Sequence, residues 1–89
     1  MMAQLSVQIL NRNGLHARPA AEMVKAAARF KSDITITRDD LEVNGKSIMG
    51  VMMLAAECGA TIVLRATGPD AEQAVAALAA LVAAKFGES

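Results

Sequence analysis

The hydrophobic pattern of this chain switches repeatedly between the two-residue period of a strand and the 3.6-residue period of a helix. Near its start, Leu5, Val7 and Ile9 alternate with polar residues, which predicts a half-buried strand. Further strands are predicted over 34–37, 41–43 and 61–67, and helices over 17–30, 48–56 and 70–86. The predicted order is therefore β-α-β-β-α-β-α, with short connections and no linker.

The predicted helices carry start signals and one internal weakness. Pro19 stands in the first turn of the first helix, where its missing N–H costs little. Ser47 is a favoured N-cap for the second helix, and Gly50 inside that helix costs about 1 kcal/mol relative to alanine. Asp70, three residues before Gln73, is typical of a capping box. The second helix therefore depends on tertiary support.

Two of the helices have recognisable apolar stripes for packing on a sheet. These stripes comprise Ala20, Val24, Ala27 and Ala28 in the first helix, and Val75, Leu78 and Val82 in the last. A chain of 89 residues has room for one domain, spanning 1–89. The pattern predicts the α+β class, with one antiparallel sheet and helices stacked on one face.

Charge and composition exclude several classes of function. The chain has nine basic and nine acidic residues and neither Trp nor Tyr, so it lacks the basic surface and stacking groups typical of nucleic-acid binding. No secretory signal or membrane-spanning segment is apparent. Cys58 is the only cysteine, which fits a reducing cytoplasm, and we expect it to be a small buried apolar residue. We expect no metal site and no cofactor.

The segment 14–20 combines three features suited to phosphoryl transfer. His16 is the only histidine, and a neutral imidazole has a free lone pair that can attack phosphorus. It lies at a predicted helix start, where unpaired N–H groups and the helix dipole favour an anion. Arg18 can donate two hydrogen bonds to phosphate oxygens. A solvated surface histidine beside a solvated arginine is the alternative reading of these residues alone.

The second helix start has a different character. Ser47 precedes a short methionine-rich helix that cannot bury all of its apolar side chains, which are Ile48, Met49, Met52 and Met53. Flexible, polarisable methionines suit a surface that meets several partners, although they can also fill an irregular core. A phosphate on Ser47 would be tolerated at a helix N-terminus and would oppose docking at a neighbouring apolar patch. Ser47 is therefore predicted as an N-cap and as a candidate regulatory site.

At both segments the sequence resembles the HPr family, the histidine-containing phosphocarriers of the bacterial phosphoenolpyruvate-dependent phosphotransferase system. Gly14-Leu15-His16-Ala17-Arg18-Pro19-Ala20 is similar to the active-site signature of that family. Gly45-Lys46-Ser47-Ile48-Met49-Gly50-Val51-Met52 is similar to its regulatory serine segment. The resemblance covers about residues 4 to 86 in the same order and spacing.

The resemblance implies an open-faced β-sandwich, a four-stranded antiparallel sheet with three helices on one face. It implies that Enzyme I phosphorylates Nδ1 of His16, that Arg18 stabilises the phosphate, and that an enzyme II A-type domain accepts the group. Ser47 would be the target of an HPr kinase/phosphorylase. The implied docking surface comprises Ala17, Ala21, Lys25, Ile48, Met49 and Met52. A cytoplasmic monomer is also implied.

Two other readings compete with a phosphocarrier. In the first, the chain is a regulatory binding module controlled through Ser47, with His16 idle. In the second it is a small enzyme of another class, for which no carboxylate pair, metal cluster or nucleotide loop is apparent. The sequence does not name the sugar or other downstream acceptor, and it does not separate a carbohydrate from a nitrogen-related phosphorelay.

Overall fold

The computed structural model describes residues 1–88, which form a four-stranded sheet with three helices on one face. In chain order the elements are β1 (Met2–Gln8), α1 (Ala17–Ala28), β2 (Asp33–Arg38), β3 (Leu41–Asn44), α2 (Ile48–Met53), β4 (Thr61–Thr67), α3 (Ala71–Ala83) and a short 3₁₀ turn, Lys85–Gly87. The strand order is β1-β4-β2-β3, and every neighbouring pair is antiparallel. The predicted order of elements and the α+β class are confirmed.

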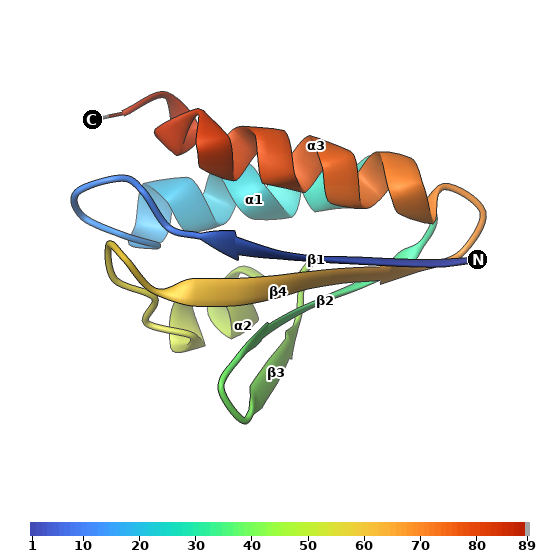
Figure 1. Ribbon diagram of the computed structural model, residues 1–89, viewed down its shortest axis with the longest axis horizontal. Coiled ribbons are helices and arrows are strands. Elements are labelled where there is room, and N and C mark those ends of the chain that lie inside the picture. The colour runs from blue at the N-terminus through green and yellow to red at the C-terminus, as the bar shows by residue number, and fades with distance from the viewer. Residues whose placement is uncertain (89) are drawn as a thin grey trace.

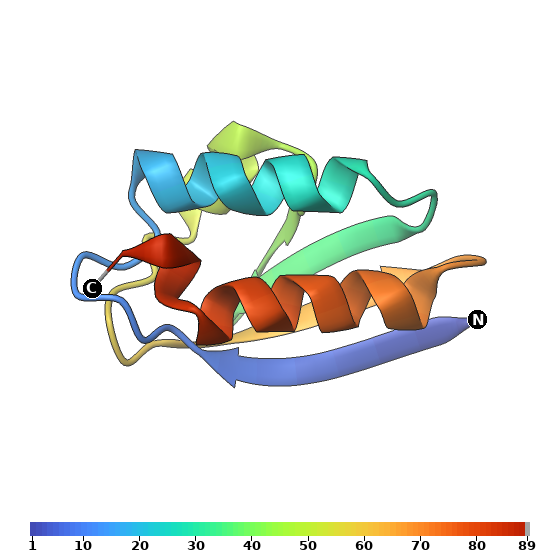
Figure 2. The ribbon, with the colours of Figure 1, turned by 90° about the horizontal axis from the view of Figure 1, so that it is seen from above.

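The register of the sheet places most apolar residues of the strands on the face that the helices cover. Leu64 of β4 lies opposite Leu5 on one side and Ile36 on the other, and Ile36 lies opposite Val43. Residues directly opposite each other share a face. Figures 1 and 2 show α1 and α3 lying along this face. Gly50 of α2 approaches Val43, so α2 packs against the same face at β3.

The packed layer between sheet and helices excludes water from a single core. Its largest fully buried side chains include Ile9, Met23, Ile36, Ile62, Leu64 and Leu78. Val75, Leu78 and Val82 of α3 are buried, as the apolar stripe of the last helix predicts. Within residues 1–88, none of the helices has the length and apolar composition needed to cross a membrane.

Several details differ from the sequence-based expectation. Ala28 is exposed, while Met23 completes the buried stripe of α1. Leu5 is 45% exposed because β1 is an edge strand that the helices cover incompletely.

Helix α2 ends at Met53 and does not continue to residue 56. The guanidinium of Arg38 donates to the carbonyl oxygens of Leu54 at 3.2 Å and Ala55 at 2.7 Å. It also pairs with Glu57 Oε1 at 2.6 Å. These bonds satisfy carbonyl groups at the end of the helix that would otherwise lack partners. A residue on β2 therefore stabilises the end of α2, which local sequence does not reveal.

The predicted capping box at Asp70 is wrong. Asp70 occupies the N-cap position of α3, but its side chain makes no bond to the helix. Its carboxylate instead accepts hydrogen bonds from the backbone N–H of Lys31 and Ser32, each at 2.9 Å, and from Ser32 Oγ at 2.6 Å. Asp70 therefore joins the start of α3 to the segment between α1 and β2.

These bonds predict an acid-dependent loss of stability. Hydrogen bonds from Ser32 Oγ and from the Lys31 N–H lower the pKa of Asp70 from 3.8 to about 2. Because the folded-state pKa is the lower one, the stabilisation is complete above pH 3.8 and is lost as the pH falls toward 2. We expect the free energy of unfolding, measured in urea, to fall more steeply over this interval for wild type than for Asp70→Asn. Parallel curves would contradict the assignment.

Candidate functional site

The loop before α1 is held by backbone contacts with the segment that follows α2. Gly14 has a φ of +67°, and a β-carbon at this position would collide with the carbonyl oxygen of Ala56. The N–H of Leu15 donates to the same oxygen at 2.8 Å, and the Leu15 side chain is buried. Glycine is required here because the backbone is left-handed and closely approached. The residue after Leu15 is thereby fixed in position.

That residue is His16, the N-cap of α1. Its backbone is extended and its carbonyl oxygen accepts the N–H of Ala20 at 3.0 Å, while its side chain makes no capping bond. The first-turn N–H groups of Ala17 and Arg18 precede Pro19, which has none. The imidazole is 41% exposed. It is thus accessible beside the positive end of a helix that can stabilise an anion.

A carboxylate that the sequence analysis did not single out contacts the imidazole. Glu88 Oε1 lies 3.0 Å from His16 Nε2 and also accepts Asn11 Nδ2 at 2.9 Å. Asn11 is fully buried, and its Nδ2 also donates to the carbonyl oxygen of Gly14 at 2.7 Å. The hydrogen bond from His16 and then that from Asn11 lower the pKa of Glu88, with smaller contributions from the charges of His16 and Arg18. No sequence motif links residues 11, 16 and 88.

The 3₁₀ turn after α3 brings Glu88 to this place. Lys85, Phe86 and Gly87 all have positive φ, so the chain folds back over the start of α1. The left-handed conformation costs about 1 to 2 kcal/mol for each non-glycine residue. Burial of the Phe86 side chain contributes a stabilisation of the same order, about 2 to 3 kcal/mol. An apolar anchor therefore holds the turn that carries Glu88.

The other candidate residues of α1 lie along its exposed side. Ala17 and Arg18 are exposed, Ala21 is half-buried, and Lys25 is exposed with Nζ 3.9 Å from Glu22 Oε1. Arg18 stands two residues from His16 on the first turn. Ala17 and Arg18 thus belong to the turn that follows His16, whereas Ala21 and Lys25 lie farther along the helix.

Ser47 is the N-cap of α2, as predicted. Its Oγ accepts the N–H of Gly50 at 3.1 Å. A β-carbon at Gly50 would be crowded by Ser47 Oγ and by Val43 Cβ, both at 3.3 Å. This crowding explains a glycine where helix propensity disfavours one.

Helix α2 presents an apolar patch, which we define as Ile48, Met49, Met52 and Met53. These side chains are 43%, 73%, 44% and 64% exposed, respectively. The methionines of this helix therefore belong to its surface and not to the core, which contains Val51. Helices α1 and α2 pack against each other, so the helix with the apolar patch contacts the helix that His16 caps.

The expectation that Cys58 is buried is wrong. Its side chain is exposed, and Sγ lies 3.6 Å from the carbonyl oxygen of Leu10. In the loop after α2, Ala56 points into the core while Glu57 and Cys58 face solvent. In this loop the buried position is therefore taken by Ala56, and the cysteine lies at the surface.

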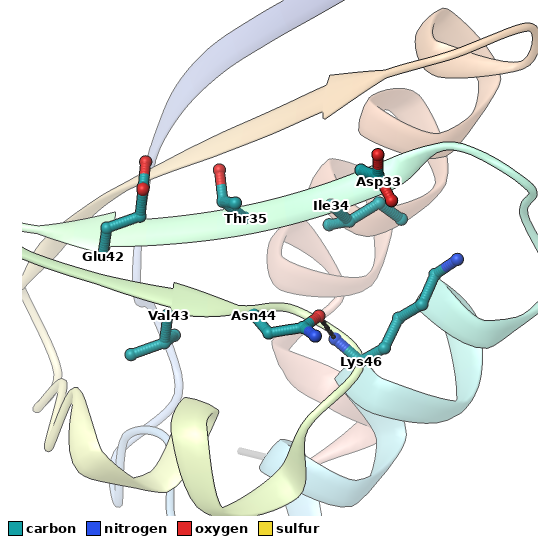
Figure 3. Close-up of a pocket in the computed structure, with 7 residues that line it drawn as sticks. All are labelled: Asp33, Ile34, Thr35, Glu42, Val43, Asn44 and Lys46. Carbon is teal, nitrogen blue, oxygen red and sulfur yellow. Dashed lines mark hydrogen bonds between the residues drawn. The ribbon is translucent and has the colours of Figure 1, made fainter.

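A hollow of about 300 Å³ lies on the β2–β3 hairpin and does not include His16 (Figure 3). It is lined by Asp33, Ile34, Thr35, Glu42, Val43, Asn44 and Lys46. Asn44 Oδ1 accepts the backbone N–H of Lys46 there at 2.9 Å. The His16 imidazole is 41% exposed at the surface, which suits a macromolecular partner better than a small substrate.

Comparisons with known proteins match this chain over most of its length. The family model described as the PTS HPr component phosphorylation site matches residues 3–84. The phosphocarrier protein HPr of Treponema pallidum (strain Nichols) is 51% identical over 87 residues, which cover 98% of this chain and 99% of the relative. The HPr-like protein Crh of Bacillus subtilis (strain 168) is 46% identical over 81 residues, 91% of this chain and 95% of the relative. The crystal structure of HPr-C-His from Thermoanaerobacter tengcongensis superposes with a TM-score of 0.94 at 45% identity, covering 98% of both chains.

Proposed function

The chain belongs to the HPr family of phosphocarrier proteins of the phosphotransferase system, and on this premise we propose that its His16 carries the phosphoryl group. Enzyme I would donate the group and an enzyme II A-type domain would accept it. The protein would act as a single cytoplasmic domain and as a monomer. It is a covalent intermediate in the relay and needs no substrate pocket of its own.

The placement of His16 at the start of α1 carries this proposal. A phosphoryl group on the ring would lie beside the unpaired N–H groups of the first turn, which favour an anion. Arg18 adds a guanidinium that can donate two parallel hydrogen bonds to phosphate oxygens. The transferred group bears its charge on those oxygens in the transition state, where fixed donors are most effective.

The apolar patch of α2 is the proposed docking surface, together with Ala17, Ala21 and Lys25. Four exposed apolar side chains on a helix of six residues are more than a monomer surface needs, and such clusters mark interaction sites. The patch adjoins α1, so a partner bound to it would have His16 within reach. Methionines let one surface adapt to a donor and to an acceptor in turn.

The direct test is incubation with Enzyme I and phosphoenolpyruvate followed by intact-mass measurement. We expect one added phosphoryl group, lost on brief acid treatment as a phosphoramidate is. A chain that stays unphosphorylated with an active Enzyme I would favour the regulatory binding module instead.

We further propose that phosphorylation of Ser47, by an HPr kinase/phosphorylase, opposes docking. Ser47 stands directly before the apolar patch, so a charge there lies beside the surface that a partner must desolvate. Aspartate is also a good N-cap, so Ser47→Asp keeps the bond to Gly50 and the fold. The charge therefore acts on binding and not on helix stability.

We expect Ser47→Asp to raise the KM of Enzyme I for this protein about five- to tenfold, which corresponds to about 1 to 1.4 kcal/mol. Ser6→Asp, on an exposed strand position of β1, adds the same charge elsewhere and should leave the KM unchanged. Equal KM values for Ser47→Asp and Ser6→Asp would refute the regulatory role.

A further inference from the structure

We propose that Glu88 is a positioning residue for phosphoryl transfer, which fixes the tautomer of His16 and stabilises the charge that forms on its ring. The proposal rests on the phosphocarrier function of His16. It follows from three contacts that join Glu88, Asn11 and His16 at the start of α1.

The first step of the argument is the direction of the hydrogen bond. An ionised carboxylate only accepts hydrogen bonds. Because Glu88 Oε1 lies 3.0 Å from His16 Nε2, that nitrogen carries the proton in the neutral ring. The lone pair is then on Nδ1, which has no hydrogen-bond partner among residues 1–88. The contact therefore presents the nucleophilic nitrogen on the opposite edge of the ring.

The second step is the fixed position of the carboxylate. The same oxygen accepts Asn11 Nδ2 at 2.9 Å, and the exposed fraction of the Glu88 side chain is only 19%. Asn11 is fully buried and is itself bound to Gly14, in the loop that leads to His16. Phe86, two residues before Glu88, is anchored in the core. The hydrogen bonds of Asn11 and the buried Phe86 thus fix the Glu88 carboxylate beside the imidazole.

The third step is the charge that develops during transfer. The Nδ1 lone pair forms the new bond to phosphorus while the bond from phosphorus to the leaving atom of the donor breaks, and that atom keeps the electron pair. The ring, still protonated on Nε2, becomes positive. Glu88 stabilises this charge through the Nε2–H, and the ring separates its carboxylate from the incoming phosphoryl group. When the phosphoryl group later leaves His16, the hydrogen bond from Nε2–H to Glu88 keeps the ring protonated on Nε2 and the phosphohistidine reactive.

The experiment distinguishes an electrostatic role of the Glu88 charge from a purely structural role of its contact with Asn11. In Glu88→Gln the amide oxygen can still accept Asn11 Nδ2, so the turn stays in place while the charge is lost. We expect the kcat of phosphorylation by Enzyme I to fall about tenfold and the KM to stay within about twofold, because Glu88 acts on the reacting ring and not on docking. Glu72→Gln, an exposed glutamate in the first turn of α3, removes the same charge and should leave both constants unchanged.

The ring itself provides a readout that does not depend on transfer. The chain has one histidine, so ¹⁵N-histidine labelling gives two ring signals without ambiguity. At a pH where the ring is neutral, the wild type should show a protonated Nε2 and an unprotonated Nδ1. In Glu88→Ala both signals should move toward the averaged positions of an exposed histidine.

The outcomes are distinct. Unchanged ring signals in Glu88→Ala, or a kcat in Glu88→Gln equal to or above that of wild type, would overturn the proposal. If the wild type accepts no phosphoryl group at all, the phosphocarrier function fails instead, and the ring signals still report whether Glu88 sets the tautomer.

Discussion

We expect His16→Ala to keep its unphosphorylated mass after incubation with Enzyme I and phosphoenolpyruvate, a complete loss of phosphoryl acceptance. The reason is that alanine removes the only imidazole in the chain, and the guanidinium of Arg18 stays protonated, so it has no free lone pair with which to attack phosphorus. In the proposed mechanism, Arg18 and the first-turn N–H groups would stabilise a phosphoryl group and would not accept one.

The fold of this variant stays intact. The imidazole is 41% exposed and its hydrogen bond is with Glu88, which keeps its bond to Asn11. We therefore expect a Tm within a few degrees of wild type. Ser47→Ala is the matched control and should still gain one acid-labile phosphoryl group. Phosphorylation of His16→Ala, or loss of it in Ser47→Ala, would contradict the assignment of the acceptor.

We expect Arg18→Ala to slow phosphoryl transfer about 10- to 100-fold with little change in KM. Hydrogen bonds to charged groups are worth about 1.5 to 3 kcal/mol, and 1.4 kcal/mol corresponds to a factor of ten. Arg18 is on the exposed first turn of α1, where its guanidinium can follow the transferred oxygens. Arg18→Lys keeps the charge but not the paired donors, so we expect an intermediate rate.

The matched control for this effect is Arg29→Ala, which removes the same charge from the other end of α1. A helix of 12 residues is about 18 Å long, so Arg29 is too far away to contact the phosphoryl group. Rapid-quench measurements of transfer from phosphorylated Enzyme I separate the rate from the affinity. Equal rates for Arg18→Ala and Arg29→Ala would remove Arg18 from the mechanism.

The parts of the structure that depend on local pattern could be predicted from sequence. Hydrophobic period identified the strands and helices, and the four-stranded sheet with its helices follows from their order. Ser47 occupies the N-cap of α2, as its residue type predicts, and His16 stands at the start of α1, as the glycine-containing loop before it and Pro19 after it predict. These features depend on neighbours within a few positions in the chain.

The features that were missed depend on contacts between distant segments. Arg38 ends α2 across 16 residues, Asp70 binds Ser32 across 38, and Glu88 reaches His16 across 72. A residue's type and its immediate neighbours do not indicate which distant residue it will contact. For the same reason the exposure of Cys58 could not be predicted, since it depends on which side chain of the loop after α2 points inward.

The hydrogen bond between Leu15 and Ala56 limits how the chain can vary in length. The loop that carries His16 takes its position from the backbone that follows α2, and Arg38 and Glu57 hold that backbone in turn. One inserted or deleted residue between Leu54 and Ala60 would displace the Ala56 carbonyl oxygen and the imidazole with it. Exposed side chains in this segment, such as Cys58, can vary, whereas its number of residues is set by an imidazole about 40 positions earlier in the chain.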